Sequence, residues 1–128
     1  MFGGKLYEGA LSAQRAPLPD TPEPIDLLRY ATLAANAHNT QPWRIALKRQ
    51  LVEIRPDQTR RTPAVDPDDH HLYASLVCVG ETLSIAARAR GLGGEITVNE
   101  DPDRPLEVAM VPGAREADAL FDAIPERQ

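Results

Sequence analysis

Apolar residues recur with a helical period in some parts of this chain and alternate with polar residues in others. The helical spacing covers residues 22–35, 67–90 and 120–124, and the alternation covers residues 43–47, 51–54, 95–99 and 106–111. The resulting order is helix, hairpin, long helix, two strands and helix. This order predicts an α+β fold in which a small sheet packs against a long central helix and shorter helices.

The chain divides at about residue 20. Residues 1–20 lack a period and finish in a proline-rich stretch, so they are predicted to form an N-terminal tail or an arm. Residues 21–128 are predicted to form one domain. Thr21 is expected to cap the first helix, with Pro22 at its first position, and Asn36 is expected to stop it.

The long helix has the strongest start signal in the chain, Asp66-Pro67-Asp68-Asp69, and a stop at Gly91. Its predicted length is about 24 residues, or roughly 36 Å. Val77, Gly80, Ser84 and Ala87 form a face of mostly small groups. That face is expected either to meet another subunit or half-domain through residues 72–87, or to pack inside the domain.

Composition excludes several classes of protein. A net charge of −5 disfavours a nucleic-acid surface, which needs a basic face. No apolar run approaches the ~20 residues that span a bilayer, so no membrane contact is expected. The lone cysteine, Cys78, excludes an internal disulfide and is expected to serve packing. The predicted location is cytoplasmic.

Most short polar motifs indicate no chemistry. His70 and His71 are adjacent on a helix and point about 100° apart, so no metal site is expected. Residues 91–94 follow a helix and precede a strand, the reverse of a phosphate loop. Arg60 and Arg61 are expected to be solvated, and the serines lack the strand-turn-helix setting of a hydrolase nucleophile. No catalytic side chain is assigned.

The exception is the run Asn36-Ala37-His38-Asn39-Thr40-Gln41-Pro42-Trp43. Its side-chain amides offer several donors and acceptors in a short arc, which suits the edge of a flat heterocycle. The alternative is a loop that satisfies its own backbone through Asx-turns.

Residues 28–44, and above all Asn39-x-Gln41-Pro42-Trp43, resemble the signature of the nitroreductase superfamily of FMN-dependent oxidoreductases. The form His-Asn-Thr-Gln-Pro-Trp-Arg is most similar to the Acg-type branch, in which two nitroreductase-like halves are fused. Residues 64–68 and the helix ending at residue 92 also fit that branch. One departure is Ala35-Asn36, where the family commonly has Pro-Ser.

The resemblance implies a nitroreductase-like N-terminal half-domain that supplies part of a flavin site. It implies FMN as cofactor, with contacts from Asn36, Ala37, Asn39 and Gln41. The implied activity is reduction of a small electron-poor acceptor with NAD(P)H as possible electron donor, or else retention of the flavin without turnover. The family's arginine-rich phosphate-binding element has no counterpart before Thr21, so the isolated chain is expected to be weakly active or inactive. The implied partner is a second copy or a second half. The alternative is a non-catalytic dimerisation or regulatory module of the same fold that no longer binds flavin.

Overall fold

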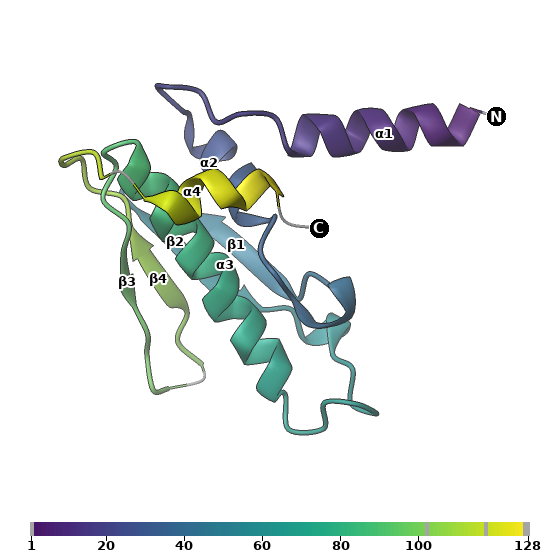
Figure 1. The fold of residues 1–128 in the computed structure, drawn as a ribbon. Coiled ribbons are helices and arrows are strands. Elements are labelled where there is room, and N and C mark those ends of the chain that lie inside the picture. The colour runs from purple at the N-terminus through teal and green to yellow at the C-terminus, as the bar shows by residue number, and fades with distance from the viewer. Residues whose placement is uncertain (1, 102, 117, 127–128) are drawn as a thin grey trace.

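A computed structural model describes residues 2–101, 103–116 and 118–126, with side chains from residue 8 onward. The α+β class is confirmed (Figure 1). The helices are α1 (Phe2–Gln14), α2 (Pro24–Ala31), α3 (His70–Ala89) and α4 (Ala119–Ala123). The strands are β1 (Trp43–Leu47), β2 (Leu51–Pro56), β3 (Glu95–Thr97) and β4 (Leu106–Ala109), and short 3₁₀ turns occupy Ala37–Asn39, Gln58–Arg60 and Ile124–Glu126.

The four strands form one antiparallel sheet in the order β1-β2-β4-β3. The predicted hairpin and its connection at residues 48–50 are confirmed, with Ile45 opposite Ile54. The later pair is also confirmed, although both strands are shorter than expected. Pro102, in the turn that joins them, lies outside the described residues.

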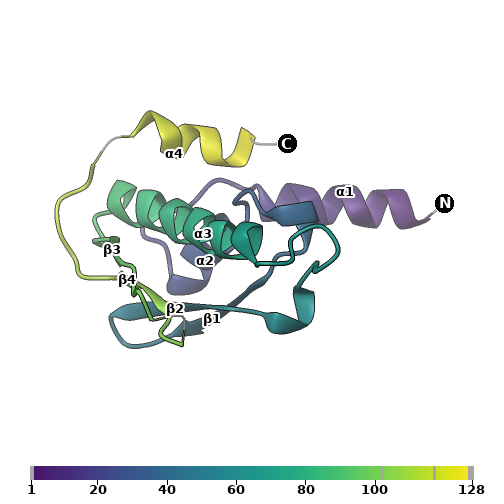
Figure 2. The same ribbon diagram turned by 90° about the horizontal axis from the view of Figure 1, so that it is seen from below.

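One face of the sheet carries the core. Helices α2, α3 and α4 all lie on the same side of the sheet (Figure 2). Alternate residues of β2 and β4 point toward them, and Ile54, Val52 and Val108 are fully buried. The opposite face carries polar residues such as Glu53 and Glu107, as a one-sided antiparallel sheet should.

Helix α3 is the centre of this core, since Val79, Leu83 and Ala86 are fully buried. It has 20 residues, about 30 Å in length. By length and composition alone, α3 could cross a membrane, although no such segment was expected from the sequence. However, 56% of its most apolar stretch is buried inside the protein. That burial is typical of a core helix.

The start of α3 differs from the prediction. The helix begins at His70 rather than Pro67, after Asp69 in a left-handed conformation. Asp66 still serves as its cap: its carboxylate accepts hydrogen bonds from the N–H groups of His71, at 3.1 Å, and Leu72, at 3.0 Å. The capping carboxylate therefore reaches the first turn across an intervening loop.

The predicted stop at Gly91 is confirmed. The Leu92 N–H donates to the Ala87 carbonyl at 2.9 Å, and the Gly91 N–H donates to the Arg88 carbonyl at 3.1 Å. With φ of +71° at Gly91, this is a Schellman ending.

Three members of the small-residue face of α3, Gly80, Ser84 and Ala87, are buried, so most of this face packs inside the domain, which was one of the two expectations for it. Its fourth member, Val77, is exposed. A Cβ on Gly80 would lie 2.8 Å from Leu106 Cδ2. Small side chains are needed here because β4 and the turn before β3 pack closely. The exposed side of α3 instead carries Tyr73, Val77 and Cys78.

Helix α2 begins two residues later than predicted and ends earlier. Glu23 rather than Thr21 is the cap, and its N–H bonds the Asp26 carboxylate at 2.9 Å in a capping box. The helix ends at Ala31, so Asn36 is not its stop.

Residues 2–14, expected to lack regular structure, form helix α1, which extends away from the body (Figure 1). Its end is held by Arg29, whose guanidinium donates to the carbonyls of Gln14, at 2.9 Å, and Ala16, at 2.7 Å. A distant side chain thus satisfies terminal carbonyls that a helix leaves unpaired.

The turn from α3 into β3 gives a test of the close packing. Gly94 has φ of +97°, and an added Cβ would lie 2.6 Å from the Ser84 carbonyl oxygen. Because backbone cannot move aside as a side chain can, Gly94→Ala should lower the free energy of unfolding by ~2 kcal/mol or more. Urea denaturation checks this against Gly113→Ala, where an added Cβ meets nothing within 4 Å. Equal midpoints for the two variants would contradict the packing.

Candidate functional site

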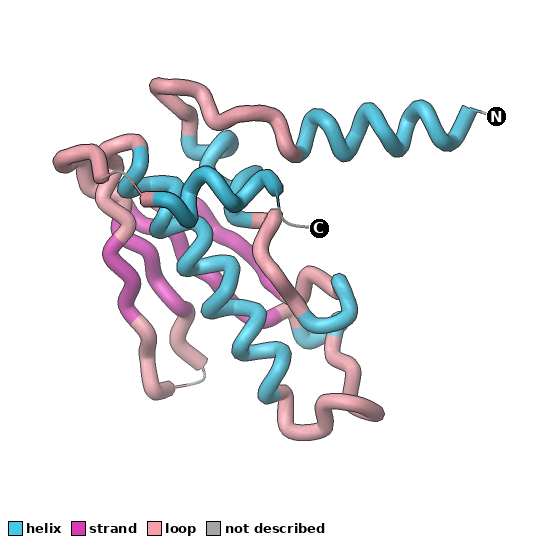
Figure 3. Tube along the Cα trace, viewed as in Figure 1, coloured by secondary structure: helices cyan, strands magenta, loops and turns pink. Residues whose placement is uncertain are grey.

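The amide-rich run forms the turn between α2 and β1. Two long connections, residues 32–42 and 57–69, lead into and out of the hairpin (Figure 3). The first is fastened to α3, because the Ala37 N–H donates to Ser75 Oγ at 3.0 Å. Ser75 is buried and in turn donates to the His71 carbonyl at 2.7 Å.

The backbone of this turn is strained. His38, Asn39 and Gln41 have φ of +49°, +54° and +49°, and none is glycine. Left-handed conformations cost L-residues on the order of 1 kcal/mol each, and they persist only where the surroundings hold them. Such residues concentrate at functional sites, so this turn is the leading site candidate.

The four residues that were expected to contact the flavin all lie in this turn. They differ in whether their polar groups are already hydrogen-bonded within the protein. The Asn36 amide oxygen accepts from the Gln41 N–H at 2.8 Å, and its NH₂ donates to the Ala34 carbonyl at 3.2 Å. The Ala37 N–H is used by Ser75. Asn36 therefore satisfies the backbone of its own loop, as the alternative proposed, but through a bond that spans five residues rather than the two of an Asx-turn. The side chains of Asn39, which is exposed, and Gln41 make no hydrogen bond within the described residues, but neither residue lines the cavities described below.

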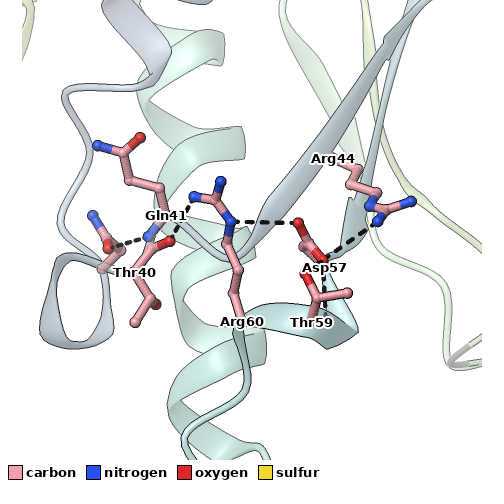
Figure 4. Close-up of polar contacts among 7 residues, drawn as sticks. Thr40, Gln41, Arg44, Asp57, Thr59 and Arg60 are labelled. Atoms are coloured by element: carbon pink, nitrogen blue, oxygen red, sulfur yellow. Dashed lines mark hydrogen bonds and ion pairs between the residues drawn. The ribbon is translucent and has the colours of Figure 1, made fainter.

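The second connection contributes a charged cluster that sequence reasoning missed. Asp57 lies between two guanidinium groups, Arg44 at 3.6 Å and Arg60 at 3.5 Å (Figure 4). Its carboxylate also accepts from the Thr59 hydroxyl at 2.6 Å and the Thr59 N–H at 3.0 Å. The spacing Asp57-x-Thr59 is an Asx-turn signal that could have indicated this local structure.

Arg60 joins the cluster to the amide-rich turn. Its Nη1 donates to the Thr40 carbonyl at 3.0 Å, and the Asp57 N–H donates to the Pro42 carbonyl at 2.9 Å. Arg60 was expected to be merely solvated, so the contact is a correction. Arg61 instead pairs with Asp69 at 2.7 Å.

A hydrogen bond from the Thr59 hydroxyl lowers the pKa of Asp57, whereas burial of the carboxylate raises that pKa. The Thr59 N–H and the nearby Arg44 and Arg60 charges reinforce the lowering, which prevails. The carboxylate is thus kept ionised near neutral pH. With Arg44 and Arg60 68% and 53% exposed, the cluster presents a net positive surface beside the turn.

Two cavities adjoin the turn and share Ala35 and Cys78. The first, of about 350 Å³, has a mixed lining in which alanines lie beside the polar residues Asn36, His38, His71 and Ser75. The second, of about 500 Å³, is lined mainly by apolar groups: Leu33, Ala34, Val77, Leu120 and Ile124. We call the two together the α3 groove. It is more polar at the amide-rich turn and apolar toward α4.

Cys78 lines both cavities and is exposed, so the expectation that it packs in the core is wrong. The His70 and His71 rings lie edge to face, with centroids 5.5 Å apart. Within the described part of the chain, no three metal-ligating side chains come together.

No family model matches this chain, and a search of curated proteins finds no match.

The Asp57 cluster gives a prediction about pH. A carboxyl whose pKa is lowered by folding contributes stability above its ordinary pKa of 3.8, and the contribution is lost as the pH falls through the lower folded value. Asp57→Asn should therefore destabilise the protein at pH 7 and weaken the loss of stability between pH 5 and about pH 2.

Urea midpoints measured across that range check this prediction. The exposed Glu100 offers the control, since Glu100→Gln should change these midpoints far less than Asp57→Asn does. Identical profiles for Asp57→Asn and the wild type would contradict the role given to the Arg44–Asp57–Arg60 cluster.

Proposed function

We propose that this chain is a nitroreductase-like half-domain that contributes part of an FMN site to an NAD(P)H-dependent oxidoreductase. The observation that carries the proposal is the α3 groove, more polar at the amide-rich turn and apolar toward α4. The resemblance of residues 28–44 to the nitroreductase signature supports the same assignment.

The two edges of the isoalloxazine ring differ in polarity in the same way as the two ends of the α3 groove. Its pyrimidine edge carries carbonyls around an N–H, and its other edge is a dimethyl-substituted benzene ring. Asn39 and Gln41, which belong to the same turn but line neither cavity, are the amides proposed to reach the first edge. Leu33, Val77 and Ile124 offer apolar surface for the second. When bound, FMN would supply the hydride chemistry, and the protein would hold and orient the ring.

The fit is partial. Asn36 and the Ala37 N–H are engaged inside the turn, which leaves fewer ring contacts than the resemblance implies. Both cavities are also shallow and open to one side. A second surface is therefore needed to enclose the ring.

The Asn36 side chain is hydrogen-bonded within the turn through both its oxygen and its NH₂ group. This favours a second candidate function, a dimerisation or regulatory module of this fold that does not bind flavin. The two functions differ in one observable. Only the first predicts that added FMN binds at the turn.

A second copy of the chain is the proposed partner, through the exposed side of α3. Val77 is 49% exposed at the centre of that side. Asp68 precedes the helix and Arg88 lies in its last turn. Two copies packed antiparallel would thus bring unlike charges together and oppose their helix dipoles.

Flavin binding provides the first test. We expect the purified chain to bind added FMN weakly, and Asn39→Ala to weaken binding about three- to tenfold, the effect of one lost hydrogen bond. Fluorescence titration of FMN measures both constants. Gln50→Ala is the control. It deletes a side-chain amide in the exposed β1–β2 turn and should leave FMN binding unchanged. Equal losses in the two variants, or no FMN binding to the wild type, would refute the flavin site.

Assembly provides the second test. Light scattering should show a dimer for the wild type and a folded monomer for Val77→Glu, because the new charge would be buried without a partner. Val65→Glu, at another exposed valine, should remain dimeric. A wild-type monomer at high concentration would contradict the proposed partner.

A further inference from the structure

One peptide unit of the amide-rich turn is held by side chains at both ends. The N–H of the Thr40–Gln41 peptide donates to Asn36 Oδ1 at 2.8 Å. The carbonyl of the same peptide accepts from Arg60 Nη1 at 3.0 Å. Figure 4 shows Arg60 reaching this carbonyl from the 3₁₀ turn that follows β2.

The orientation of this peptide decides whether Asn36, which lines the smaller cavity, keeps its bond to the Gln41 N–H. Gln41 follows it with φ of +49°, and Asn39 precedes it with φ of +54°. A peptide flip would change φ of Gln41 and ψ of Thr40 together and would release Gln41 from its left-handed conformation. The strained orientation therefore needs an external hold.

Arg60 is suited to supply that hold because it is itself fixed. Its Nε lies 3.5 Å from Asp57 Oδ2. Asp57 is anchored in turn by Thr59 and by its own N–H, which donates to the Pro42 carbonyl. The hold thus connects two loops that are 20 residues apart in sequence.

We propose that Arg60 is a positioning residue that keeps the Thr40–Gln41 peptide in its strained orientation and so holds Asn36 in the lining of the smaller cavity, where the ligand would lie. The ligand part of this inference rests on the proposed flavin function. The backbone part stands on the geometry of the turn alone.

The test needs a readout that is independent of flavin. In ¹⁵N-labelled protein, hydrogen exchange of the Gln41 amide reports directly on the Asn36 bond to this peptide. Arg60→Gln should speed that exchange about five- to tenfold, the effect of one partly exposed hydrogen bond. Exchange of the Val52 and Val108 amides in the sheet should not change. Arg60→Lys, which keeps a charged donor, should restore much of the protection.

Arg61→Gln is the matched control, because Arg61 is adjacent but pairs with Asp69 instead. Trp43, the only tryptophan, adds a second local signal through its fluorescence. Faster Gln41 exchange in Arg60→Gln alone supports the hold. Unchanged exchange in Arg60→Gln, or equal acceleration in Arg61→Gln, overturns it whatever FMN does.

FMN titration of the same variants separates the two proposals. Weaker binding in Arg60→Gln, together with faster Gln41 exchange, supports the positioning role. If the exchange responds as expected while the wild type binds no FMN, the proposed function fails, and with it the ligand part of this inference, whereas the hold on the peptide is supported.

Discussion

Burial of one side of α3 against β2 and β4 is the constraint on which the rest of the structure depends. Val79, Leu83 and Ala86 are fully buried on that side, and Gly80 and Ser84 permit the close approach of β4 and the turn before β3. Because these residues bury one side of the helix against the sheet, its opposite side faces outward. That outward side forms the floor of the α3 groove.

The same helix also places the candidate site. Ser75, buried in its first half, fixes the Ala37 end of the amide-rich turn, and Arg60 fixes the other end from the loop after β2. The turn is therefore held between the helix and the hairpin. Three left-handed residues persist there because the turn is bound at both ends, by Ser75 of the buried face of α3 and by Arg60 of the loop after β2.

Local patterns predicted the elements well where the stabilising contacts are local. Alternation located the β1–β2 hairpin, and Gly91 marked the end of α3, because each signal acts within a few residues. The start of α3 was wrong because Asp66 caps it across a loop. Helix α1 was missed, and the donor that satisfies its end, Arg29, lies beyond the segment itself.

The candidate site was predicted in place but not in detail. The sequence located its amide groups. It could not show that the Asn36 side chain accepts a hydrogen bond from the Gln41 N–H, because that bond depends on the conformation of the turn. Nor could it show that Arg60, rather than its neighbour Arg61, reaches Thr40. Whether the small-residue face of α3 packs inside the domain or against another subunit was left open, because spacing alone does not reveal which surface covers a face.

The proposal that a flavin binds at the amide-rich turn and the α3 groove can be tested by mapping ¹H–¹⁵N chemical shifts during addition of FMN. Shifts are expected at residues 36–41 and along residues 74–82, with little change at the polar face of the sheet. Shifts confined to other surfaces, or no shifts at millimolar FMN, would contradict it.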